Sequence, residues 1–157
     1  MPYELSTWEL LARVALAAAL GLAIGWDREK KEKAAGLRTM ALVSLGAAGV
    51  MIAAIEMSAD LHADDVRLDP LRVISGVIGG IGFIGGGAIL HSRHHVRGLT
   101  TAATIWAAAG IGVASGAGLY RLAIILTGVV LVILVVVTAL KGTLLPEREG
   151  APRNDQQ

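Results

Sequence analysis

The chain has 157 residues, of which 54% are hydrophobic and 17% charged, and its formal net charge is +1. A soluble domain carries about 25% charged residues, so this composition indicates a membrane protein, and the small net charge argues against a nucleic-acid partner. Because the chain has no cysteine, disulfides, cysteine-zinc sites and thiol catalysis are excluded.

The first apolar segment, at about 8–26, is expected to be a spanning helix rather than a signal peptide, since no basic residues precede it. Trp8 and Trp26 lie eighteen residues apart, about 27 Å along a helix, which suits the two interfacial belts. Gly21 and Gly25 form a small-xxx-small pair for helix contact. Arg13 has two interpretations: a side chain that snorkels to the interface, or a partner for a carboxylate inside the bundle.

A highly charged loop follows, and the second span is expected at about 38–57. The candidate functional charges of this region are Asp27, Arg28, Glu29 and Arg38. They could form a solvated face that interacts with anionic lipid, or a fixed charge network at the ends of the first two spans.

The loop at 58–70 is acidic and could hold Mg²⁺ or Ca²⁺ weakly through carboxylates, but it lacks an ordered calcium-loop pattern, so a solvated loop is the preferred interpretation. Asp69 is expected to cap the third helix, with Pro70 in its first turn. Asp69 and Arg72 are three residues apart and are expected to pair at the outer membrane surface, as a simple surface pair, a structural tie or part of a substrate entrance.

The third span is expected at 71–90 and contains seven glycines between positions 76 and 87. Each glycine costs about 1 kcal/mol in a soluble helix, whereas in a membrane glycines let neighbouring helices approach closely. The match to G-x-G-x-x-G at 80–85 lacks the preceding strand that a dinucleotide site requires. The segment could serve for helix packing or line an ion path with its carbonyls, and we expect it at the centre of the bundle. Its candidate residues are Ser75, Gly76, Gly79, Gly80, Gly82, Phe83, Gly86 and Gly87.

The loop at 91–98 is basic and includes Arg97, a further candidate charge, and three histidines, His91, His94 and His95, whose spacing would suit a metal only on a helix. The fourth span, at 99–115, is short and rich in alanine, so we expect it to be packed among other helices. Its candidate residues could link helices or coordinate a dehydrated cation: Thr100, Thr101, Thr104 and Trp106.

The fifth span, at 120–140, is built mostly of Leu, Ile and Val and is expected to face lipid, and a polar tail occupies 142–157. The fold class is therefore all-α, a polytopic membrane bundle of about five transmembrane helices in a single domain, 1–141. Ten of the fourteen Lys and Arg residues fall in the loops 27–38 and 91–98 and in the C-terminal segment 141–157. This asymmetry predicts the N-terminus outside and the C-terminus in the cytoplasm.

No Ser/His/Asp or Cys/His arrangement is evident, and carboxylates are nearly absent from the spans. We therefore expect no enzymatic activity and no cofactor, although Mg²⁺ or another cation remains a candidate ligand. Because several helices carry small-residue faces that need cover, a homodimer is the default expectation.

Five sequence blocks, considered together, resemble the signature of the MgtC/SapB membrane family. They are Gly25-Trp-Asp-Arg-Glu29, Ala35-Gly-Leu-Arg-Thr39, Asp69-Pro-Leu-Arg72, Gly80-Ile-Gly-Phe-Ile-Gly85 and Val96-Arg-Gly-Leu-Thr-Thr-Ala-Ala-Thr-Ile-Trp106. Their order and spacing cover about residues 10–140. The departures are Asp27, where the family often has Glu, and Ser75 and Gly79, where more polar residues are common.

The resemblance implies a multi-pass protein of the bacterial inner membrane, linked to magnesium limitation, acid stress and intracellular survival, here without the family's C-terminal cytoplasmic domain. Some members are thought to bind other inner-membrane proteins, including the ATP synthase. Two hypotheses follow. The protein acts through helix contacts with itself or with partner membrane proteins, or it is an ion transporter or channel whose third helix lines the path.

Overall fold

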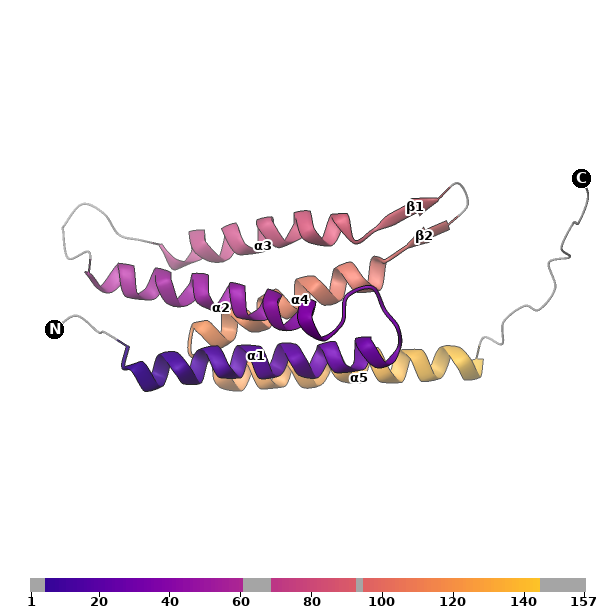
Figure 1. Ribbon diagram of the computed structural model, residues 1–157, viewed down its shortest axis with the longest axis horizontal. Coiled ribbons are helices and arrows are strands. Elements are labelled where there is room, and N and C mark those ends of the chain that lie inside the picture. Colours follow the sequence, from indigo (N-terminus) through magenta and orange to yellow (C-terminus); the bar gives the residue numbers. More distant parts are fainter. Residues whose placement is uncertain (1–4, 61–68, 93–94, 145–157) are drawn as a thin grey trace, which may run out of the picture.

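The computed structural model describes residues 5–60, 69–92 and 95–144, which form five helices and one short hairpin. The helices are α1 (Thr7–Lys30), α2 (Leu37–Asp60), α3 (Pro70–Gly87), α4 (Leu99–Gly116) and α5 (Tyr120–Leu144). Successive helices run in alternating directions along one long axis, so that α1 begins at one end of the bundle and α5 finishes at the other (Figure 1). The all-α class is therefore confirmed.

Two of the helix starts follow from local sequence. At α1, Ser6 Oγ accepts a hydrogen bond from Glu9 N at 3.3 Å, and Glu9 Oε2 accepts one from Ser6 N at 3.0 Å, which completes a capping box. At α3, Asp69 Oδ1 accepts from Leu71 N at 2.9 Å and Pro70 occupies the first helical position, as predicted. These caps satisfy backbone donors that the helix itself leaves free.

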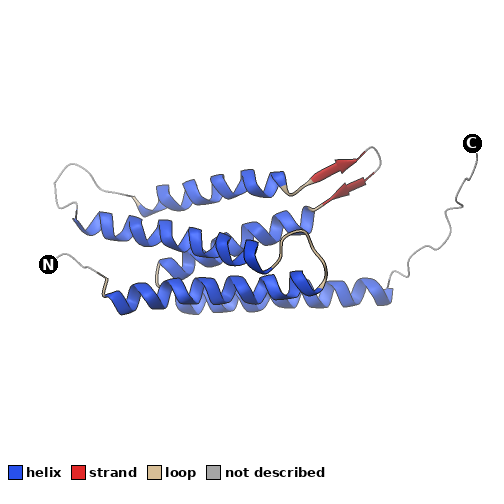
Figure 2. Ribbon diagram, in the orientation of Figure 1, coloured by secondary structure: helices blue, strands red, loops and turns tan. Residues whose placement is uncertain are grey.

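The third span is shorter than predicted. α3 ends at Gly87, because the chain then enters strand β1 (Leu90–Ser92), which pairs antiparallel with β2 (His95–Arg97) (Figure 2). Four helices, α1, α2, α4 and α5, are long and apolar enough to cross a membrane, whereas the apolar part of α3 covers only Leu71–Gly87. Seventeen residues reach about 26 Å along a helix, somewhat less than a hydrocarbon core of about 30 Å.

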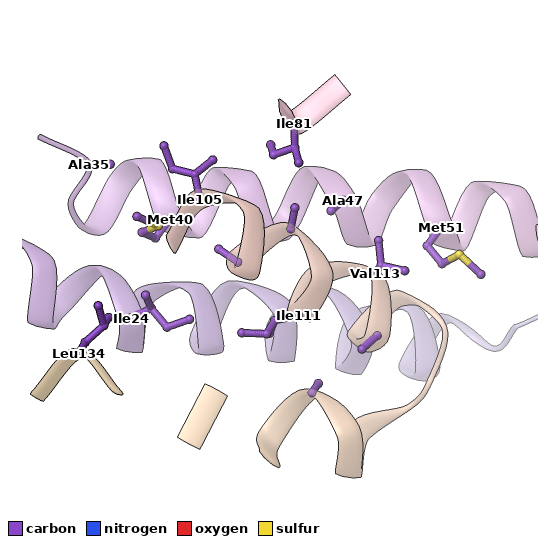
Figure 3. Packing of buried hydrophobic residues seen from close by; sticks show 14 residues of the cluster. Ile24, Ala35, Met40, Ala47, Met51, Ile81, Ile105, Ile111, Val113 and Leu134 are labelled. Atoms are coloured by element: carbon purple, nitrogen blue, oxygen red, sulfur yellow. The ribbon is translucent and has the colours of Figure 1, made fainter. Parts of the chain in front are cut away.

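The core of the bundle is built around α4 and not around α3. Of the apolar segments, α4 has 61% of its residues buried, whereas the corresponding part of α5 has 17%. Figure 3 shows Ile105, Ile111 and Val113 of α4 beside buried residues of α1 and α2, while α3 contributes only Ile81 to the buried cluster of the described residues. The expectation of a packed fourth helix is confirmed, and the expectation of a central third helix is wrong.

Small residues explain how α4 reaches this position. A Cβ built on Gly116 would lie 2.5 Å from the carbonyl oxygen of Ala48, and one built on Gly112 would overlap the carbonyl oxygen of Ser44. Gly21 and Gly25 of α1 similarly lie against the α2 backbone, with 2.6 Å from each built Cβ to its nearest atom. The predicted contact through Gly21 and Gly25 is thus confirmed, and it brings the two backbones as close as glycine permits.

Candidate functional site

The charged residues at the C-terminal end of α1 form a fixed network rather than a solvated face. Lys31 Nζ lies 2.8 Å from Asp27 Oδ1 and donates to the carbonyl oxygen of Leu134 at 3.1 Å, which ties α1 to α5. Glu29 Oε2 accepts from Leu37 N at 3.0 Å and so caps the start of α2. Gly36 makes room for this carboxylate, because a Cβ there would overlap Glu29 Oε2.

Arg28, next to Asp27 in the chain, makes a separate contact with α4. Its side chain is only 3% exposed, and its Nη2 donates to Thr101 Oγ1 of α4 at 2.6 Å. Its Nε has no hydrogen-bond partner among the described residues. Arg28 therefore joins α1 to the start of α4, and its Nε–H remains available to donate a further hydrogen bond.

Two cavities flank the network. The first, of about 630 Å³, lies beside Arg28 and is lined by α1, α4, α5 and the end of β2. The second, of about 650 Å³, lies over the turn between α1 and α2, and Arg38 lines it with an exposed side chain. The charges that the sequence singled out in this region are thus divided between two different sites.

The α4 residues proposed for cation binding do not converge on one point. Thr101 accepts from Arg28, whereas Thr104 Oγ1 donates to the carbonyl oxygen of Thr100 within the helix at 2.7 Å. Trp106 is half exposed on the surface. The interpretation of these threonines as helix-linking residues is supported by Thr101. Among the described residues, no group of three or more His, Asp or Glu side chains could hold a metal ion.

Arg13 lies at the opposite end of the bundle and differs from both interpretations of the sequence. Its side chain is buried, with 8% exposed, so it does not snorkel. Its partner is not a carboxylate, because Nη1 donates to the carbonyl oxygen of Gly116 at 2.8 Å. The chain then turns at Gly118, whose φ of 76° favours glycine. A cation at the C-terminal end of a helix is stabilised by the free carbonyls and the helix dipole.

The glycine segment of α3 is uncovered. A Cβ built at any of six of its glycines would meet no atom of the described chain within 4 Å: Gly76, Gly79, Gly80, Gly82, Gly86 and Gly87. Phe83, on the same side, is 87% exposed. Only Gly85 lies against a neighbouring helix, with 3.6 Å from a built Cβ to the carbonyl oxygen of Ala102. We call the six open glycines and Phe83 the glycine face.

The remaining candidates lie near the start of α3 and at the end of the hairpin that follows it. Ser75 Oγ donates to the carbonyl oxygen of Leu71 at 2.9 Å and is exposed. Asp69 caps α3 and does not pair with Arg72, since the only ion pair in the described part of the chain is Lys31–Asp27. Local capping therefore replaces the predicted surface pair. Arg97 is exposed at the end of β2.

The histidine cluster and the acidic loop lie only partly within the described residues. His91 and His95 lie on paired strands, so the helical spacing on which the metal interpretation depended is absent there. His94 and residues 61–68 of the acidic loop lie outside the described residues.

Comparison with known proteins identifies the family to which the chain belongs. The MgtC family model matches residues 14–143. The chain is 46% identical over 119 residues to a protein of Escherichia coli K12 named "Putative magnesium transporter YhiD". The aligned region covers 75% of the chain and 55% of that protein. It is 41% identical over 115 residues to Protein MgtC of Salmonella typhimurium LT2, covering 73% of the chain and 46% of that protein.

Protein SapB of Bacillus subtilis 168 is 38% identical over 117 residues, with coverage of 72% of the chain and 50% of SapB. The chain thus spans about half the length of the relatives it matches. No solved structure is significantly similar to it. With four helices able to cross a membrane and a family match over most of its length, this chain is a multi-pass membrane protein that belongs to the MgtC family.

Proposed function

We propose that the protein is a non-enzymatic component of magnesium homeostasis in the bacterial inner membrane, which acts through helix contacts made by the glycine face of α3. The observation that carries the proposal is the absence of any described neighbour over six glycines of one helix. In a bilayer, small residues on a helix surface let a second helix approach closely, and apolar contact with lipid is then exchanged for tight packing. The link to magnesium rests on the name of one relative, the putative magnesium transporter YhiD of Escherichia coli K12.

The first expected occupant of the glycine face is a second copy of the chain. A two-fold interface uses the same patch on both subunits, so the patch has to be self-complementary. Phe83 projects from the face as a single large side chain, 87% exposed, with glycines one turn before and after it at 79, 80, 86 and 87. A phenyl ring of one copy would fit against the glycines of the other. Partner membrane proteins with a similar small-residue helix would compete for the same face.

The single-chain geometry gives less support to ion transport. The glycine face is open to the outside of the bundle, and no described element forms an opposite wall. A path along α3 would therefore need a second chain to close it. Because one relative carries the name of a magnesium transporter, transport is kept as the second candidate, with any path at the interface between two copies.

Self-association is tested in bilayers with labelled full-length chain. We expect energy transfer between differently labelled copies of the wild type, and its loss in Gly80→Leu, which fills the glycine face. Gly128→Leu is the matched control, because Gly128 of α5 is also exposed and a Cβ built there also meets no described atom within 4 Å. Equal transfer in Gly80→Leu and wild type would contradict the proposal.

Mg²⁺ flux into proteoliposomes, measured with wild type and Gly82→Leu, separates the two candidates. The proposed role predicts no flux from either chain, together with restored growth of a deletion strain in low magnesium by wild type and not by Gly80→Leu. Robust flux by wild type that Gly82→Leu abolishes would replace the contact role with transport.

A further inference from the structure

The cavity beside Arg28 has a strongly uneven lining. Among the residues that the structure describes, those that line it with a charge are all cationic, namely Arg28, Lys31 and Lys33, and none is a carboxylate. Asp27, the neighbouring acid, is already paired with Lys31 at 2.8 Å. The cavity therefore combines a volume of about 630 Å³ with an excess of positive charge.

Arg28 is the buried member of this set. A guanidinium is always protonated in proteins, and a buried charge is costly unless it is paired and hydrogen-bonded. Arg28 is 3% exposed, its side-chain hydrogen bond within the described part of the chain goes to the neutral Thr101 hydroxyl, and its Nε donor is unused there. The side chain thus presents an incompletely satisfied cation at the cavity.

The start of α4 adds further donors at the same place. The helix begins at Leu99, and its N-cap residue is Gly98, which provides no side-chain hydrogen bond to the first turn. The first backbone N–H groups of a helix have no partner within it and form the positive end of its dipole. Gly98, Leu99, Thr100 and Thr101 all line the cavity. Helix starts of this kind bind phosphate and related anions.

The two ends of α4 differ in how well they suit an arginine side chain. Arg13 and Arg28 lie fifteen residues apart on α1, and their partners Gly116 and Thr101 lie fifteen apart on α4. Arg13 meets the negative, carbonyl end of the helix, which is favourable. Arg28 meets the positive, amide end, which is unfavourable unless an anion lies between them.

The uncharged walls indicate what carries the anion. Ile133, Leu134 and Val137 of α5 line one side of the cavity, and Ile133 and Val137 are half exposed on the outer surface of the bundle. A free inorganic ion would gain nothing from these walls, whereas an acyl chain beside α5 would cover them.

We propose that this cavity binds the phosphate group of an anionic phospholipid. Arg28 and the first amides of α4 hold the phosphate oxygens, Lys33 adds attraction at the rim, and an acyl chain follows α5. The inference concerns α1, α4 and α5, and does not depend on the glycine face or on the role of the protein in magnesium homeostasis.

The test uses the purified full chain in detergent, with its melting temperature followed during titration of phosphatidylglycerol, phosphatidylcholine or inorganic phosphate. We expect phosphatidylglycerol to raise the melting temperature well above the effect of phosphatidylcholine. Arg28→Gln should weaken this response about tenfold or more, since a hydrogen-bonded ionic contact is lost. Arg38→Gln is the matched control, because it removes an exposed cation that lines the other cavity.

A second variant avoids any loss of folding through the buried site. Thr100 is exposed and lines the cavity, so Thr100→Glu would supply a carboxylate at the positive end of α4. We expect it to raise the melting temperature without lipid and to reduce the response to phosphatidylglycerol, whereas Thr100→Gln should do neither.

The lipid and the free ion are distinguished by the same titrations. Stabilisation by inorganic phosphate equal to that by phosphatidylglycerol, and lost in Arg28→Gln, would keep the phosphate site and assign it to a free anion. Arg28→Gln and Thr100→Glu chains that respond to both ligands like the wild type would overturn the proposal.

Discussion

α3 and α4 are both eighteen residues long and rich in glycine, yet they use glycine in opposite ways. In α4, Gly112 and Gly116 lie directly against the backbone of α2. In α3, six of seven glycines meet no described neighbour within 4 Å of their Cβ positions. Glycine permits two helices to approach closely. In α4 this contact is completed within the single chain, whereas in α3 it is left open. The first stabilises the fold, and the second leaves a helix surface that no described residue covers.

The largest effect is expected at the completed contact. Gly112→Leu would place a side chain where the carbonyl oxygen of Ser44 lies, and a backbone atom cannot move aside as a flexible side chain can. We expect a loss of about 3 kcal/mol or more of stability, measured by thermal unfolding in detergent. Gly110→Leu, on the same helix but with no atom within 4 Å, is the control. Similar unfolding curves for the two variants would show that α4 does not pack as described.

The next effect is expected at the start of α4. Thr101→Val removes the hydroxyl that accepts from Arg28 at 2.6 Å and leaves the buried guanidinium without this partner. The expected cost is about 2 to 3 kcal/mol. Thr100→Val removes an exposed hydroxyl one residue earlier and should change stability by less than about 0.5 kcal/mol. The difference between the two midpoints of unfolding measures the Arg28 contact.

A smaller effect is expected at the other end of the same helix. Arg13→Met keeps most of the side-chain volume but loses the hydrogen bond to the carbonyl oxygen of Gly116, at a cost of about 1 to 2 kcal/mol. Arg121→Met changes an exposed arginine and serves as the reference in the same unfolding measurement. If Arg13→Met were no less stable than Arg121→Met, the end of α4 would not depend on this contact.

The smallest effect on stability is expected at the open contact. Gly80→Leu adds a side chain where no described atom lies within 4 Å, and leucine has the better helix propensity. The midpoint of unfolding of the dissociated chain should therefore stay the same or rise slightly. A marked loss of stability in Gly80→Leu would mean that the glycine face is already covered within one chain.

Much of the fold could be predicted because it depends on local chemistry. The length of the apolar segments predicted the helices, and Asp69 with Pro70 predicted the start of α3. The spacing of Gly21 and Gly25 predicted the contact between α1 and α2. The place of α3 in the bundle could not be obtained in this way. A glycine-rich sequence indicates that another helix can pack closely against the segment. It does not identify that helix or show whether it belongs to the same chain.

The charged sites at the two ends of α1 could likewise be predicted only in part from the sequence. The charges at the end of α1 were identified, but the division into the Arg28 and Arg38 cavities depends on where α4 and α5 pack. The role of Arg13 was missed because its partner, the carbonyl oxygen of Gly116, is a backbone atom 103 residues away. The sequence alone carries no signal for this partner, because the equal fifteen-residue separations of the two arginines on α1 and of their partners on α4 become apparent only in the folded chain.

The measurement that most directly tests the open glycine face is cysteine cross-linking in native membranes, which is clean here because the chain has no cysteine of its own. Single substitutions Gly76→Cys, Gly80→Cys and Gly87→Cys on α3 are compared with Gly128→Cys on the exposed surface of α5. A disulfide requires Cα atoms within about 7 Å, so we predict a cross-linked dimer for at least one α3 position and none for Gly128→Cys. The absence of cross-linked dimer at all three α3 positions, or an equal yield at Gly128→Cys, would contradict self-association through α3.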